Sequence, residues 1–120
     1  MTNGSKKTKY AKPVRASVLA CIPALSIGAA NAEDLTAGVV MEKMDGGERY
    51  TYVAGIVEGL AHARYMMDNR DTAGRSCIYR WFFKADGTLD LIYEAFRRYP
   101  QLLPGQVVGT LANQECGGGD

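Results

Sequence analysis

The sequence is poor in the residues that catalytic and metal-binding sites need. It contains one histidine, His62, and of its three cysteines only Cys77 and Cys116 lie outside the N-terminal quarter. Catalytic triads and zinc sites require several such side chains close together. Glycine motifs that cradle phosphate are missing, and Ser76, the only serine after residue 32, is not framed by the glycines of a nucleophile elbow. We therefore expect no enzymatic activity, no metal site and no cofactor.

Acidic residues are absent from the first 32 positions, which carry five lysines and arginines. The remaining 88 residues hold nine basic and 13 acidic side chains, a net charge of −4. Nucleic-acid binding requires a clustered basic surface, so this distribution argues against a nucleic-acid partner and favours a basic one.

The N-terminal segment has the three parts of an export signal. A cationic stretch ends at Arg15, an apolar run covers residues 16–29, and residues 30–32 read Ala-Asn-Ala. We expect cleavage between Ala32 and Glu33, so that residues 1–32 are a signal peptide and residues 33–120 a periplasmic domain. The apolar run is shorter than the roughly 20 residues that cross a bilayer, so we expect no stable membrane anchor after cleavage.

Two cysteines then remain in a chain that is sent to an oxidising compartment. Cys77 and Cys116 are therefore expected to form a disulfide, which would close a loop of roughly 40 residues and contribute about 3 to 4 kcal/mol. The alternative is a reactive Cys77 thiolate, activated by Arg75 and Arg80.

Hydrophobic spacing predicts helices throughout the remainder of the chain. We expect a short helix over residues 36–44, a capping box formed by Asp45 and Glu48, and a long helix ending near Met67, with apolar residues at helical spacing between positions 52 and 60. On this helix Gly55 and Gly59 form, with Ala63, a strip of small residues that would let another helix approach closely.

The second half of the chain continues this pattern. Residues 68–74 form a polar break, residues 76–83 a short aromatic helix, and Thr88 is expected to cap a helix that Pro100 stops. Pro104 opens a last helix that ends at Cys116. No alternating run is long enough for a sheet, so the sequence predicts an all-α bundle of four to five short helices. The disulfide would join the third helix to the last.

Tyrosines and arginines flank the polar break. These residues are favoured at binding surfaces, and we expect Arg64, Tyr65 and Arg80 to lie near one another and contact a partner, with Arg98 as a further candidate.

The chain resembles the immunity proteins of type VI secretion amidase effectors, a periplasmic helical family related in outline to the acid-stress chaperone HdeA. The similar features are residues 52–60 (YVAGIVEGL), Cys77, residues 89–100 with their final Tyr-Pro, and Cys116. The resemblance implies a binding protein that occludes a protein partner, a secreted amidase toxin. The alternative is an HdeA-like acid-stress chaperone in the periplasm, and a homodimer is left open.

Overall fold

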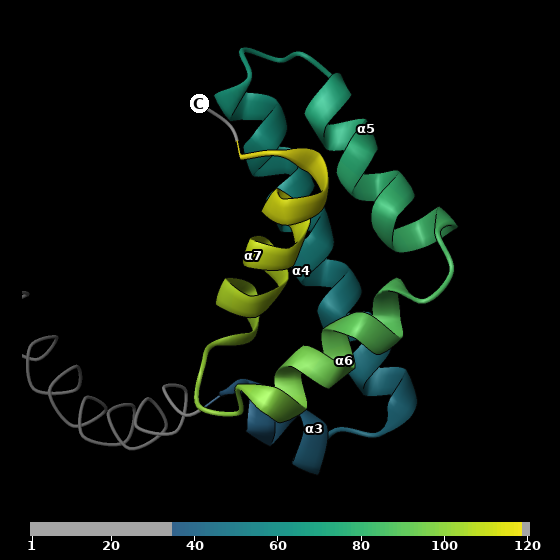
Figure 1. The fold of residues 1–120 in the computed structure, drawn as a ribbon, viewed down its shortest axis with the longest axis vertical. Coiled ribbons are helices and arrows are strands. Elements are labelled where there is room, and N and C mark those ends of the chain that lie inside the picture. Colours follow the sequence, from purple (N-terminus) through teal and green to yellow (C-terminus); the bar gives the residue numbers. More distant parts are fainter. Residues whose placement is uncertain (1–34, 119–120) are drawn as a thin grey trace, which may run out of the picture. The chain divides into compact units, whose positions relative to one another are not determined.

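The computed structural model describes residues 35–118, and this part of the chain is an all-α bundle with one disulfide and no strand. Its elements are α3 (Ala37–Lys43), α4 (Gly46–Met67), α5 (Ala73–Tyr79), the π-helical turn η2 (Arg80–Lys84), α6 (Thr88–Arg98) and α7 (Pro104–Cys116). The predicted fold class is confirmed. In Figure 1, α5 and α7 lie along the long helix α4, and α3 and α6 lie at the end where α4 begins. The predicted signal peptide falls outside the described residues.

The predicted capping box at the start of α4 is confirmed. The Glu48 amide donates to Asp45 Oδ1 at 2.9 Å, and the Asp45 amide donates to Glu48 Oε2 at 3.0 Å. Because both donors would otherwise lack partners at a helix start, the pair defines where α4 begins. Among residues 35–118, no helix combines the length and the apolar character needed to cross a bilayer.

The core surrounds one face of α4. Val53, Val57 and Ala61 on this helix are buried, and they pack with buried side chains of every other element. The two largest fully buried side chains of the described residues are Phe96 and Ile92 of α6. Burial of each such side chain stabilises the folded state by roughly 1.5 to 3 kcal/mol. The apolar spacing between positions 52 and 60 therefore identified the inward face of the central helix correctly.

Two element boundaries differ from the prediction. Helix α5 begins at Ala73 rather than at residue 76, and it continues into a π-helical turn. Thr88 does not cap α6: Gly87, with φ 86°, occupies the cap position, and the buried Thr88 hydroxyl donates instead to the Trp81 carbonyl at 2.6 Å. The hydroxyl thus satisfies a carbonyl within η2 and joins this turn to α6.

The expected close approach at the small-residue strip of α4 is wrong. Gly55 and Gly59 are exposed, and a Cβ added at either would meet nothing within 4 Å. Close approach occurs elsewhere: a Cβ at Gly38 would lie 2.8 Å from Pro100 Cβ, and one at Gly74 would lie 2.7 Å from Arg64 Nε.

The predicted disulfide between Cys77 and Cys116 is confirmed. It joins the third helix, α5, to the end of α7, with 5.8 Å between the two Cα atoms and 39 residues of sequence separation. Because α5 is only seven residues long, the cross-link holds a short element against the bundle.

Candidate functional site

Aromatic side chains form a continuous exposed surface where α5 and η2 pass the start of α4. Tyr79 stacks on Phe83 with 5.6 Å between ring centroids, and Phe83 meets Phe82 edge-on at 4.8 Å. Phe82 in turn stacks on Tyr50 of α4 at 5.9 Å. Tyr50, Tyr79 and Phe83 remain 44%, 37% and 38% exposed. We call these three residues, with the buried Phe82 beneath them, the aromatic surface.

A π-helical turn carries Phe82 and Phe83 of this surface. The Ala85 amide donates to the Arg80 carbonyl at 3.0 Å, a bond that spans five residues instead of four. The wider turn accompanies two consecutive buried rings, Trp81 and Phe82, followed directly by the exposed Phe83. π-Helical turns are rare and occur frequently at functional sites.

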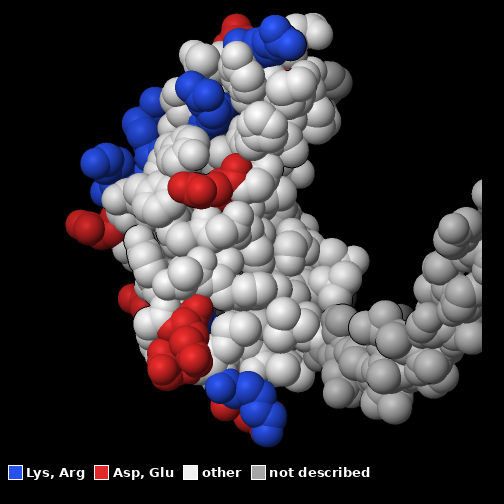
Figure 2. All heavy atoms as spheres, turned by 180° about the vertical axis from the view of Figure 1, so that it is seen from behind, with Lys and Arg blue, Asp and Glu red and all other residues white. Residues whose placement is uncertain are grey.

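The segment that carries these rings is also basic. Residues 70–84 contain Arg70, Arg75, Arg80 and Lys84 against one acid, Asp71. Within the described residues none of the four cations takes part in an ion pair. Figure 2, which shows the molecule from behind, places blue basic side chains along the edge formed by α5 and η2. The surface is therefore locally positive, although residues 33–120 together carry a net negative charge.

Arg64 is engaged inside the fold. Its side chain is 15% exposed, and Nε lies 2.8 Å from Asp68 Oδ2. The other guanidinium nitrogens donate to the carbonyls of Cys116 and Gly117 at the end of α7. Gly74 of α5 packs against the same side chain. Arg64 thus ties together the ends of α4 and α7 and the start of α5.

The other two predicted binding residues lie on different elements, Tyr65 on α4 and Arg80 on η2. Tyr65 is half-buried under the Arg75 guanidinium, which lies 4.9 Å from the ring centroid. Arg80 is exposed at the start of η2, beside the aromatic surface. Arg75 and Arg80 are five positions apart, which corresponds to roughly 7 Å of helix rise. Tyr65 therefore lies beside Arg75, whereas Arg80 directly follows Tyr79 of the aromatic surface.

Sequence reasoning did not select Tyr50, Tyr79 and Phe83 as binding residues. A signal was present, because Tyr79 and Phe83 are four residues apart, whereas the inward positions of this segment are Ile78, Trp81 and Phe82. An aromatic pair at that spacing off the apolar stripe indicates an exposed aromatic face.

Arg49 is a further polar residue that joins elements of the fold. Arg49 donates from Nη2 to the carbonyls of Met41 and Met44, at 3.0 and 2.8 Å, and its guanidinium lies 5.3 Å from the Tyr93 ring centroid. Burial raises the pKa of the Tyr93 phenol, an effect that the charge of Arg49 opposes, and burial also raises the pKa of Tyr52. Arg49 therefore secures the end of α3 against α4 and α6.

His62, the one histidine of the sequence, lies on the surface of α4. It is exposed on α4, with its ring 6.5 Å from that of Tyr65. No group of three or more His, Cys, Asp or Glu side chains within residues 35–118 is arranged to hold a metal ion.

No protein-family model matches the chain, and neither a curated protein nor a solved structure does. The resemblance to the immunity proteins therefore stays a prediction.

Proposed function

We propose that the chain is an exported binding protein that occludes a protein partner, in the manner of the immunity proteins of type VI secretion amidase effectors. The observation that carries this proposal is the aromatic surface, flanked by unpaired cations on α5 and η2. Tyrosine and arginine dominate the energetic centres of protein interfaces. Steric occlusion of an active site needs such a surface on a rigid support and requires no chemistry of its own.

A disulfide and a buried hydrogen bond hold the segment that carries the aromatic surface. The disulfide from Cys77 holds α5 to α7, and the Thr88 hydroxyl holds the Trp81 carbonyl next to the exposed rings. A preorganised surface loses less conformational entropy on binding than a loop that must order itself. The aromatic surface is thus suited to fill a complementary cleft on the partner.

The test begins with isolation of the partner. The protein purified from its source cells is used to retain proteins from a periplasmic extract, and a retained amidase is then titrated by calorimetry. We expect Tyr79→Ala and Phe83→Ala each to weaken binding by about 2 kcal/mol, and Arg80→Ala by a smaller amount.

Leu91→Ala is the matched control, because Leu91 is 50% exposed on α6 and lies outside the aromatic surface. It should leave the affinity unchanged. The proposal fails if the retained amidase remains active in the complex, or if the aromatic substitutions leave its affinity unchanged while melting temperatures stay constant.

An acid-stress chaperone of the HdeA type is the second candidate, and one observation favours it. Residues 33–120 contain 13 acidic side chains, and an acid-stress chaperone depends on many carboxylates. A protein of that type would expose apolar surface when acid neutralises such groups. The assay is aggregation of a client protein at about pH 2 to 3, with and without this chain. Unchanged aggregation would reject the chaperone.

A further inference from the structure

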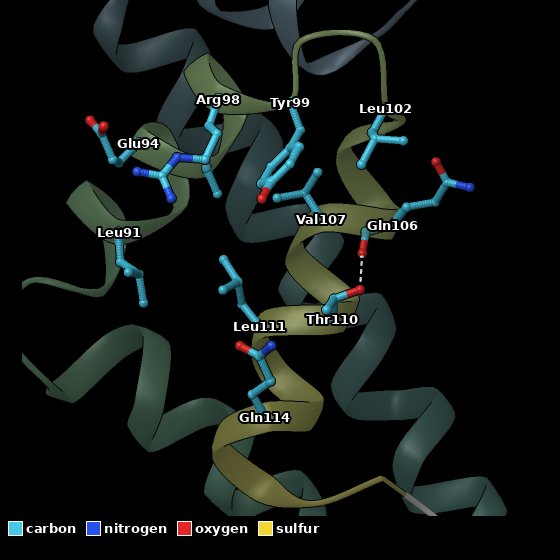
Figure 3. A pocket seen from close by; sticks show the side chains of 11 residues that line it. Leu91, Glu94, Arg98, Tyr99, Leu102, Gln106, Val107, Thr110, Leu111 and Gln114 are labelled. Carbon is cyan, nitrogen blue, oxygen red and sulfur yellow. Dashed lines mark hydrogen bonds between the residues drawn. The ribbon is translucent and has the colours of Figure 1, made fainter.

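A second surface, separate from the aromatic surface, lies between α6 and α7. These helices enclose an open groove of about 660 Å³, shown from close by in Figure 3. Small-molecule sites commonly measure roughly 300 to 1,000 Å³. The groove therefore has the size of a site for one small ligand.

The groove is lined by core residues and by apolar side chains that remain exposed. Leu91, Tyr99 and Leu102 remain 50%, 45% and 37% exposed, and they adjoin Val107 and Leu111 of α7. Leu91 lies outside the inward-facing stripe of α6, which contains the buried residues Ile92 and Phe96. An extended apolar ligand could cover this exposed area and remove it from water.

One charged group stands at the mouth of the groove without a counter-ion. Arg98 makes no ion pair within the described residues, and Figure 3 shows its guanidinium between Glu94 and Leu91 at one side of the groove. The only acid in the lining, Glu94, lies 3.6 Å from Arg97, and its carboxylate points away from the groove in the same view. The groove therefore presents one uncompensated positive charge above an apolar floor.

We propose that this groove binds a single alkyl chain that ends in a carboxylate. The alkyl chain lies along Leu91, Val107 and Leu111, and the carboxylate meets the Arg98 guanidinium. A guanidinium pairs with a carboxylate through two parallel hydrogen bonds. A doubly charged phosphate head would exceed the single compensating charge, and an alkyl ammonium would place like charges at the mouth.

The experiment is a calorimetric titration of the purified protein with dodecanoate below its micelle concentration. We expect micromolar affinity, and we expect dodecanol and dodecylammonium to bind at least about tenfold more weakly, because they lose the charge-assisted pair with Arg98.

Two variants locate the ligand. Arg98→Gln should weaken dodecanoate binding about tenfold, whereas Arg80→Gln, at an exposed cation outside the groove, should leave it unchanged. Thr110→Trp places a large ring in the groove from an exposed position of α7 and should abolish binding. Leu91→Asn is the second groove variant and should also weaken binding, should Thr110→Trp fail to fold.

Several results would overturn the proposal. Absence of heat with dodecanoate would do so, as would equal affinity for dodecanol or unchanged affinity in both groove variants. A dimer that Thr110→Trp dissociates would assign the groove to a second copy of the chain instead. None of these results affects the proposed protein-binding function, because that function rests on α5 and η2.

Discussion

Substitution of Gly74 by alanine should destabilise the protein, although alanine is the better helix former. The added Cβ would lie 2.7 Å from both Arg64 Nε and Asp68 Oδ2, and 2.8 Å from Arg64 Cγ. Retreat of Arg64 would weaken its bonds to Asp68 and to the carbonyls at the end of α7. Overpacking costs about 1 to 3 kcal/mol and a lost hydrogen bond to a charged group about 1.5 to 3, against a propensity gain near 1.

We therefore expect a net loss of about 2 kcal/mol. For a domain of this size, that loss corresponds to a melting temperature roughly 8 to 16 °C lower. Differential scanning calorimetry of the disulfide-bonded protein measures it. Gly59→Ala is the matched control, because Gly59 is an exposed helical glycine with nothing within 4 Å of an added Cβ. It should raise stability by about 1 kcal/mol.

A double-mutant cycle identifies the cause. In an Arg64→Ala background two of the three close atoms are gone, and the Asp68 carboxylate, released from its ion pair, can turn away from the added Cβ. Gly74→Ala should then become neutral or stabilising, with a coupling energy above about 1 kcal/mol. If Gly74→Ala is as favourable as Gly59→Ala in the native background, the reasoning about Arg64 is refuted.

Three further outcomes follow from the structure and the sequence. Replacing Cys77 and Cys116 together by serine should lower the free energy of unfolding by about 4 kcal/mol, as expected for a 39-residue loop, and denaturant titration would contradict this if the two proteins were equally stable. Tyr52 and Tyr93, whose phenol pKa values burial raises, should form phenolate at higher pH than free tyrosine does in ultraviolet titration. Because the unfolded chain releases these protons at lower pH than the folded chain does, the free energy of unfolding should fall as pH rises above about 10. An increase in that free energy over the same pH range would contradict this prediction. The mature protein should begin at Glu33 by mass spectrometry, and a start upstream of that residue would argue against the proposed cleavage site.

The features that the sequence predicted well depend on residues close together in the chain, or on there being only one possible pair of residues. The box formed by Asp45 and Glu48 involves residues three apart, so its geometry follows from the helix start alone. The inward positions Val53 and Val57 follow from helical periodicity. The disulfide was predictable because only two cysteines lie beyond the expected signal peptide.

The features that it missed depend on which neighbour covers a given face. Gly55 and Gly59 have the composition of a helix-packing strip, but α5 and α7 contact α4 elsewhere and leave this strip exposed. Thr88 has the composition of a cap, but a carbonyl from the preceding turn competes for its hydroxyl. Neither competition can be read from a single segment, because each involves a partner that only the tertiary fold supplies.

The candidate site shows the same distinction between composition and environment. Arg64 and Arg80 both flank the segment that the sequence indicates, yet the Arg64 donors already have acceptors in Asp68 and at the end of α7, whereas Arg80 is exposed. A guanidinium with internal acceptors must break those bonds before it can bind a partner, so its net gain is small. Arg64 therefore influences the aromatic surface through the position of α5, to which Gly74 connects it. Loss of binding in an Arg64 variant would accordingly be accompanied by loss of stability, and loss of binding in an Arg80 variant would not.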